Sequence, residues 1–93
     1  MAIKIDLRVP PCGPVTEVAD FVKQCEDAGF DGVGMLDSQL LERDIFVSMA
    51  VAAQATERIR ISAAVLNPVT RHISVTASAA KTVAEIAPGR IEF

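Results

Sequence analysis

The sequence predicts an α/β fold with parallel strands, arranged as the βαβαβαβ N-terminal portion of a TIM (β/α)8 barrel. Strand-like and helical segments alternate along all 93 residues, without a linker or a low-complexity stretch. The four strand candidates are centred on Ile5, Val33, Ile61 and Ile91, an even spacing of about 28 to 30 residues. Segments in this order form right-handed βαβ units, and eight such units would total roughly 230 residues, near the size of a complete barrel. We therefore interpret residues 1–93 as a single partial domain with three βα units and the start of the fourth strand.

The first βα unit covers residues 3–29. Residues 3–9 alternate apolar and polar side chains, which is typical of a strand with one buried face. Prolines and a glycine then end regular structure. Thr16 is a suitable N-cap for the following helix, in which apolar residues recur at helical spacing up to Ala28. Gly29 stands where a glycine commonly ends a helix.

The second βα unit combines a short apolar strand with an unusually apolar helix. The strand is predicted over residues 32–36 and stops at Asp37. Asp44 is the predicted N-cap of a helix that runs to about Ala55. Because this helix has almost no polar face, we expect it to be buried on more than one side.

The third unit begins with a strand over residues 59–65, which ends before Pro68. A helix rich in Ala and Ser follows over residues 74–86, and Gly89 ends it. A fourth strand is predicted over residues 90–93. A complete doubly wound domain would show the same order of elements, but its last strand would be very short. The partial barrel is therefore the better interpretation.

Composition argues against two classes of partner. The net charge is −3, the nine Lys and Arg residues form no cluster, and no Trp or Tyr is present, so nothing predicts nucleic-acid binding. No apolar run reaches the ~18 residues of a membrane span and no signal-peptide core is found, so we expect a cytoplasmic protein without membrane contact. Hydrophobic residues make up 51% of the chain, which is high for so short a chain, so some of them are expected to face something outside it.

The two cysteines, Cys12 and Cys25, have neither the spacing of a metal-binding pair nor the density of a disulfide framework. We interpret both as reduced thiols, with Cys25 on the buried face of the first helix. No other residues have metal-ligand spacing, so no metal site is predicted.

Candidate site residues follow the predicted strands, because ligands of parallel α/β folds meet the loops at the C-terminal ends of the strands. These loops cover residues 9–14, 37–39 and 63–72. Asp37 and Ser38 place an acceptor and a hydroxyl directly after the second strand, where they could hold a polar ring edge or position a proton. Asp37 could equally serve only to cap the following loop. Both interpretations stay open from the sequence.

The loop after the third strand is long and polar. Arg71 could pair with a phosphate or a carboxylate. His72 is the only histidine, and beside an arginine it is more typical of a hydrogen-bonding residue at a helix entry than of a catalyst. No glycine-rich phosphate loop follows a strand.

Several segments of the chain resemble one enzyme family. They are residues 28–33 leading to 36–38, the Asn-Pro-Val-Thr-Arg-His run of residues 67–72, residues 76–80 and residues 87–91. Together these segments resemble the luciferase-like superfamily, and within it the methylenetetrahydromethanopterin reductase-like branch. The match covers essentially the whole chain and about a third of a family barrel.

The resemblance implies a cofactor and a reaction. In that family reduced FMN, or the deazaflavin coenzyme F-420, lies across the C-terminal mouth of the barrel. The cofactor passes hydride to a small-molecule substrate, or reacts with oxygen in the monooxygenase branch.

The resemblance also implies six cofactor-binding positions. Asp37 and Ser38 match positions on the cofactor side of the second strand. Ala64 and Val65 match a non-prolyl cis peptide that bulges against the cofactor ring. Some deazaflavin members have a histidine where this chain has Ser38, so no catalytic residue is assigned. The six positions are Asp37, Ser38, Ala63, Ala64, Val65 and Asn67.

Small side chains at the bulge have a physical explanation that does not depend on the family. A backbone that presses on the face of a ring needs small residues, and Ala63 and Ala64 supply two. The alternative is that both are small because a barrel core packs small residues there.

Three functions remain open from the sequence. The first is the N-terminal part of a flavin- or deazaflavin-dependent oxidoreductase. The second is a catalytically inactive folded fragment or assembly piece with no cofactor, and the third is a freestanding α/β domain that binds a small ligand. We also expect a homo-oligomer that forms through the second and third helices or through the open strand at residues 90–93, because members of the family dimerise through the equivalent helices and an unpaired strand is a template for another chain.

Overall fold

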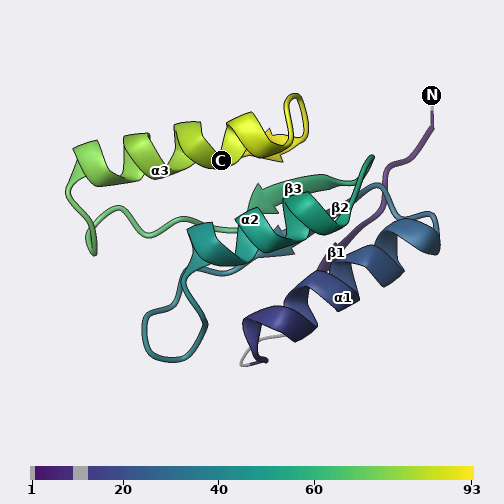
Figure 1. Cartoon of the computed structure of the whole chain (residues 1–93), viewed down its shortest axis with the longest axis horizontal. Coiled ribbons are helices and arrows are strands. Elements are labelled where there is room, and N and C mark those ends of the chain that lie inside the picture. The colour runs from purple at the N-terminus through teal and green to yellow at the C-terminus, as the bar shows by residue number, and fades with distance from the viewer. Residues whose placement is uncertain (1, 10–12) are drawn as a thin grey trace.

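The chain forms a four-stranded parallel sheet with three helices, as the sequence predicts. The computed structural model describes residues 2–9 and 13–93. The strands lie in sequential order, and every neighbouring pair is parallel (Figure 1). In chain order the elements are β1 (Asp6–Arg8), α1 (Val15–Asp27), β2 (Gly32–Met35), α2 (Ile45–Ala55), β3 (Arg60–Ala63), α3 (Ile73–Ile86) and β4 (Ile91–Glu92).

One face of the sheet forms the core with the helices. Leu7, Val33, Ile61 and Ile91 lie next to one another in register across the four strands. Val33 and Ile61 are fully buried, and all four belong to the core or pack against it. Alternate residues of a strand face opposite sides, so the neighbours of this row lie on the other face, which no helix of the described residues covers. The sheet thus has the helix-covered outer face and the open inner face of a barrel arc.

Helix α2 occupies the centre of the helical layer. It packs against α1 on one side and α3 on the other, with the sheet behind it (Figure 1). Ile45 and Met49 are almost completely buried, and only Val47 of its large apolar residues is half exposed. The predicted burial on more than one side is confirmed. The predicted cap is also confirmed, because the carboxylate of Asp44 accepts a hydrogen bond from the backbone N–H of Val47 at 3.0 Å.

The predicted cap of α1 is wrong. The helix begins at Val15, and Pro14 occupies the N-cap position with no side-chain hydrogen bond. The fixed φ of proline suits helix entry, and the Pro14 carbonyl accepts from the N–H groups of Glu17 and Val18. At the other end Gly29 has φ of +92°, a conformation that favours glycine, so the predicted helix end is confirmed.

The strands are shorter than the apolar pattern predicts. Strand β1 covers only Asp6–Arg8, and Ile3 and Ile5, which we expected in the core, are 87% and 56% exposed. Strand β2 begins at Gly32, so Ile5 has no strand opposite it. Ile5 instead forms two hydrogen bonds with Asp31. Its backbone N–H donates to the Asp31 carboxylate, and its carbonyl accepts from the Asp31 N–H.

The remaining boundaries differ by smaller amounts. Strand β2 ends at Met35 rather than at residue 36, and β3 covers Arg60–Ala63 rather than residues 59–65. Strand β4 covers Ile91–Glu92 rather than residues 90–93, and it pairs with Ile61 and Ser62 of β3. Helix α3 begins one residue earlier than predicted, at Ile73.

Cys25 is a buried free thiol, as predicted, and burial raises its pKa. Cys12 lies outside the described residues. Within the described parts of the chain, no helix has both the length and the apolar character needed to cross a membrane.

Candidate functional site

The loops after β2 and β3 lie together at the C-terminal edge of the sheet (Figure 1). A hydrogen bond joins them directly, because the Asp37 carboxylate accepts from the backbone N–H of Asn67 at 2.9 Å. Parallel strands bring their C-terminal ends to one edge, so two segments 30 residues apart in sequence meet here. This edge carries all six predicted cofactor-binding positions.

A buried ion pair is the centre of the site. The two terminal nitrogens of Arg71 donate to the two carboxylate oxygens of Asp37 at 2.8 and 3.1 Å. Gln39 adds a fourth hydrogen bond, at 2.9 Å, to those from Arg71 and Asn67. The side chain of Asp37 is 1% exposed and that of Arg71 is 12% exposed. The pairing with a carboxylate that the sequence offered for Arg71 is confirmed.

The ion pair keeps both groups charged. Hydrogen bonds from Arg71 hold the pKa of Asp37 below its ordinary value, although burial acts in the opposite direction. The same contact raises the pKa of the Arg71 guanidinium. Paired, hydrogen-bonded charges of this kind are tolerated where an unpaired one would not be.

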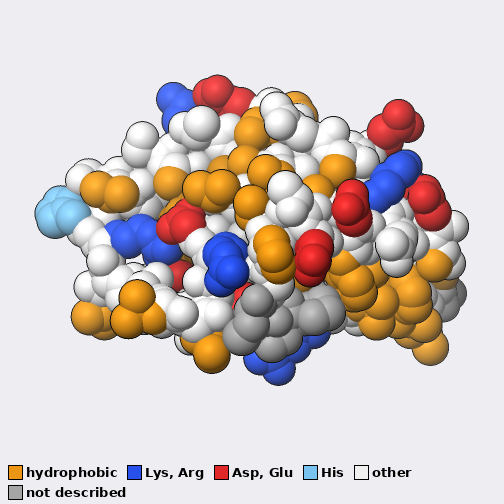
Figure 2. Space-filling view, turned by 60° about the horizontal axis from the view of Figure 1, so that its bottom comes forward, with side chains coloured by type: hydrophobic (Ala, Val, Ile, Leu, Met, Phe, Trp, Pro, Cys, Tyr) orange, Lys and Arg blue, Asp and Glu red, His pale blue; other side chains and the backbone are white. Residues whose placement is uncertain are grey.

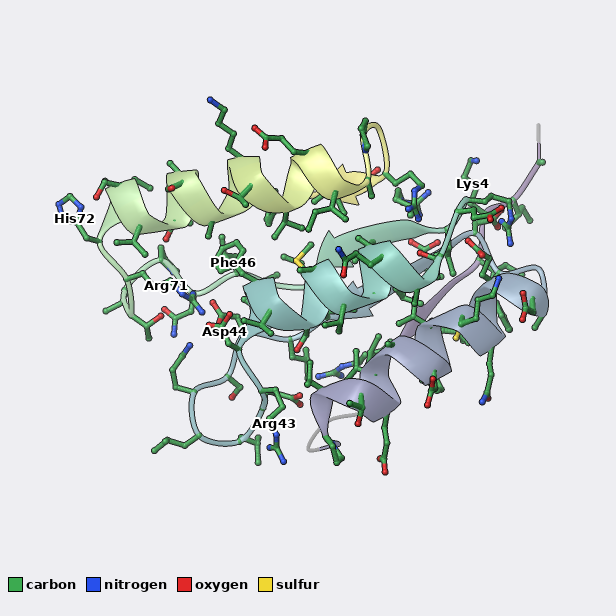
Figure 3. The ribbon with its side chains drawn as sticks, viewed as in Figure 1. Lys4, Arg43, Asp44, Phe46, Arg71 and His72 are labelled. Atoms are coloured by element: carbon green, nitrogen blue, oxygen red, sulfur yellow. The ribbon has the colours of Figure 1, made fainter. Side chains whose placement is uncertain are left out.

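Two residues at the start of α2 complete the cluster. Asp44 lies 3.3 Å from a terminal nitrogen of Arg71, and the guanidinium carbon lies 4.9 Å above the ring of Phe46 (Figure 3). The ring of Phe93, after β4, lies 5.9 Å from that of Phe46. The sequence predicted Asp44 only as a helix cap, and it gave no reason to single out Phe46 from the other apolar residues of the predicted helix. Their position at the N-terminus of α2, and so at the same edge, is the signal that could have placed them here.

The segment after β3 carries the predicted bulge. The peptide bond between Ala64 and Val65 is cis, as the resemblance implied. Ala63 is half-buried as the last residue of β3, whereas Ala64 is exposed and Val65 is 78% exposed. Asn67 uses its side-chain oxygen within the loop, where it accepts from the N–H of Val69 at 3.0 Å. The cofactor contacts of these four residues stay predictions.

Asp37 and Ser38 differ in what they leave free. The oxygens of Asp37 already accept four hydrogen bonds, so it links the two loops rather than only capping its own. The hydroxyl of Ser38 has no hydrogen-bond partner among the described residues, and the residue is partly exposed. Cofactor binding by either residue stays a prediction.

His72 acts at the helix entry, as expected. It is the N-cap of α3, and its Nδ1 accepts from the backbone N–H of Ser74 at 3.2 Å. The ring is exposed and points away from the Arg71 cluster (Figure 3). No group of His, Cys, Asp and Glu side chains that could hold a metal ion is present in the described ranges 2–9 and 13–93.

Comparison with known proteins identifies the family. The family model described as luciferase-like monooxygenase matches residues 3–93. The chain belongs to the luciferase-like monooxygenase family.

Relatives of this luciferase-like chain include two archaeal reductases. The chain is 36% identical over 80 residues to 5,10-methylenetetrahydromethanopterin reductase of Methanolobus tindarius, covering 86% of this chain and 24% of that protein. It is 31% identical over 88 residues to the enzyme of the same name from Archaeoglobus fulgidus, covering 95% of this chain and 26% of that protein. The luciferase-like chain thus spans about a quarter of the length of these relatives.

A solved structure has the same fold. The coenzyme F-420 dependent tetrahydromethanopterin reductase from Methanopyrus kandleri matches with a TM-score of 0.88 and 27% identity. The match covers 98% of the luciferase-like chain and 26% of that structure. The parallel βαβαβαβ arrangement is therefore the start of a barrel of the kind these reductases have.

Proposed function

We propose that the chain forms the first part of the barrel of an oxidoreductase that uses coenzyme F-420. The observation that carries the proposal is the combination of a TM-score of 0.88 to an F-420 dependent reductase with 36% identity to a methylenetetrahydromethanopterin reductase. The proposed reaction is hydride transfer between the deazaflavin and a small-molecule substrate. FMN as the cofactor, with monooxygenation, is the second possibility that family membership leaves open.

The C-terminal edge fits a flat ring system. On the uncovered face of the sheet, Gly34, Ser62 and Ala64 are close neighbours and all small, and a Cβ at Gly34 would come within 3.1 Å of the Ala64 side chain. Such a surface lets a planar ring approach the backbone closely. The free hydroxyl of Ser38 lies at the same edge and offers both a donor and an acceptor. When bound, the deazaflavin would supply the carbon that gives or accepts hydride.

Titration of the purified chain with coenzyme F-420 tests this proposal. We expect saturable binding, measured by the fluorescence of the deazaflavin, and weaker binding of FMN. Tighter binding of FMN would favour the monooxygenase alternative. Binding of neither cofactor to a folded chain would favour the other alternative, a folded piece without a cofactor.

We also propose that the chain associates with copies of itself through α2 and α3. An open groove of about 370 Å³ lies between these helices, and Val47, Val51 and Ala79 contribute to its lining. Hydrophobic side chains reach the surface in a band across the face drawn in Figure 2. The two-residue strand β4 is a second candidate contact, because it has no neighbour on its outer side among the described residues.

Sedimentation velocity at tens of micromolar should therefore give a dimer or a larger species. A stable contact buries about 800 Å² on each partner, so a charge placed in its centre is strongly unfavourable. Val47→Glu should shift the chain toward monomer, whereas Lys81→Glu, an exposed position on α3, should not. A monodisperse wild-type monomer would exclude association at this concentration.

A further inference from the structure

We infer that Arg71 is a positioning residue of the proposed cofactor site, where its guanidinium holds the β3–α3 loop in one conformation against the β2–α2 loop. The inference rests on the proposed function for its consequence, cofactor binding. The β3–α3 loop carries three of the predicted cofactor-binding residues, Ala64, Val65 and Asn67. Arg71 belongs to the same loop but reaches away from it, toward other segments.

Apolar burial holds only a small part of the loop. Val65 is 78% exposed and Val69 is 86% exposed, so two large apolar residues of the loop contribute almost nothing to a core. Burial orders a chain segment only in proportion to the apolar area it removes from water. Leu66 is partly buried and packs against the core, so it anchors the loop at one point, and polar contacts hold the residues that follow it.

Those polar contacts converge on one carboxylate. The Asp37 oxygen that accepts from Arg71 at 2.8 Å also accepts from the backbone N–H of Asn67 at 2.9 Å. With the Asp37 side chain 1% exposed, removing Arg71 leaves a buried carboxylate without its counter-charge. That carboxylate can regain solvation only if the loop that covers it opens. The hydrogen bond to Asn67 is then lost as well.

The guanidinium is fixed by shape as well as by charge. One nitrogen contacts both Asp37 and Asp44, and the guanidinium carbon lies over the Phe46 ring, which also contacts the ring of Phe93. Arg71 thus ties its own loop to the β2–α2 loop and the start of α2. Lysine has neither a fork that matches a carboxylate nor a plane that stacks on an aromatic ring.

The order of this loop is separable from the stability of the fold. The core centres on residues such as Val33, Met49 and Ile61, none of which is exposed. Arg71 is not a member of that cluster, although its guanidinium lies over the ring of Phe46, which is. An opened loop therefore leaves the sheet and its helices folded. A residue that served only global stability would instead affect loop and core alike.

Amide hydrogen exchange of the Arg71→Met variant distinguishes these two cases. We expect the N–H groups of Asn67 and Val69 to exchange at least tenfold faster than in the wild type, relative to those of Val33 and Ile61. The matched control is Arg43→Met, which removes an arginine from the same edge. Arg43 points away from the cluster and forms no ion pair within the described chain (Figure 3). The control should leave the exchange of both loop amides unchanged.

Three results would overturn the inference. The first is an equal change at loop and core amides, or no change at the loop. The second is full recovery of slow loop exchange in Arg71→Lys, because a bare charge would then suffice. The third is an unchanged affinity for coenzyme F-420 in Arg71→Met although the loop has opened. The expected affinity is at least tenfold lower in Arg71→Met and equal to wild type in Arg43→Met.

The two proposals fail separately. If the wild-type chain binds no coenzyme F-420, the proposed function loses its support while the exchange pattern still decides whether Arg71 positions the loop. If the wild type binds and the exchange pattern is uniform, only the role of Arg71 is overturned.

Discussion

Replacing Glu26 with glutamine is expected to lower the free energy of unfolding by roughly 3 kcal/mol at neutral pH. The folded chain lowers the pKa of the Glu26 carboxyl from 4.5 to about 2, and a shift of that size corresponds to this free energy. Glu26 lies near the end of α1 and is only 8% exposed. One of its carboxylate oxygens accepts from the consecutive backbone N–H groups of Glu57, Arg58 and Ile59 at 3.0, 2.7 and 2.9 Å. The carboxylate thus joins α1 to the turn between α2 and β3.

The charge on Glu26 makes the stability depend on pH. Burial alone would raise its pKa, but the three N–H groups and Lys23 outweigh burial and lower the pKa from 4.5 to about 2. Between these values the unfolded chain binds more protons than the folded one, so the stability falls as the pH falls through this window. Above pH 4.5 the full contribution of the carboxylate is present.

Urea denaturation at a series of pH values measures both effects. Glu26→Gln should unfold at lower urea at pH 7, and its stability should vary less between pH 4.5 and 2 than that of the wild type. Glu85→Gln, on the exposed side of α3, should match the wild type. Equal acid sensitivity of Glu26→Gln and wild type would show that another carboxylate is responsible.

Local signals in the sequence predicted the fold well because each acts within a few residues. Asp44 bonds the N–H three residues later, and Gly29 ends a helix by its own backbone conformation. The even spacing of strands required only a crossover rule, and it predicted the parallel order correctly. Strand lengths were less predictable. Ile3 and Ile5 alternate as a strand does, but pairing needs a partner, and β2 begins too late to provide one.

The site was predictable by position and less so by contact. That Asp37 and Asn67 share an edge follows from parallel strands, and the hydrogen bond between them confirms it. In the structure the Asp37 carboxylate pairs with Arg71 rather than with a ligand. These two residues are 34 positions apart in the sequence, so no local pattern could predict the contact. Sequence alone left a phosphate and a carboxylate equally open as the partner of Arg71. Only the packed arrangement of two loops and the start of α2 decides between them.

Arg90 illustrates the same limit, and its replacement carries the second large effect. In the sequence it is the first residue of the predicted fourth strand, and nothing in the pattern indicates a partner for its charge. In the structure its guanidinium enters the C-terminal end of α2. It donates to the carbonyls of Ala53 and Thr56 at 3.2 and 3.1 Å, to the Thr56 hydroxyl at 2.9 Å and to the carbonyl of Ile59 at 2.9 Å.

These acceptors explain why the arginine is needed. The last carbonyls of a helix have no partner within the helix and carry a partial negative charge. Helix α2 has no basic residue in its last turn, so the cation comes from the segment before β4. Thr56 is only 6% exposed, and water cannot readily replace Arg90 there. The Arg90 side chain thus hydrogen-bonds carbonyls at the C-terminal end of α2 and attaches β4 to that end.

Arg90→Met should therefore lower the free energy of unfolding by about 2 to 4 kcal/mol, since several charge-assisted hydrogen bonds are lost and buried carbonyls are left unpaired. For a domain of this size each kcal/mol lowers the melting temperature by roughly 4 to 8 °C, so thermal unfolding followed by circular dichroism measures the effect.

Lys81→Met, an exposed position on α3, is the control. Thr56→Val removes one of the acceptors, and it should cost less in the Arg90→Met background than in the wild type. The hydrogen bond that the Thr56 hydroxyl donates to the Ala52 carbonyl is lost in both backgrounds, so it cancels in this comparison. An Arg90→Met variant that melts within 2 °C or so of the wild type would contradict the assignment, because water would then serve the carbonyls as well as the guanidinium does.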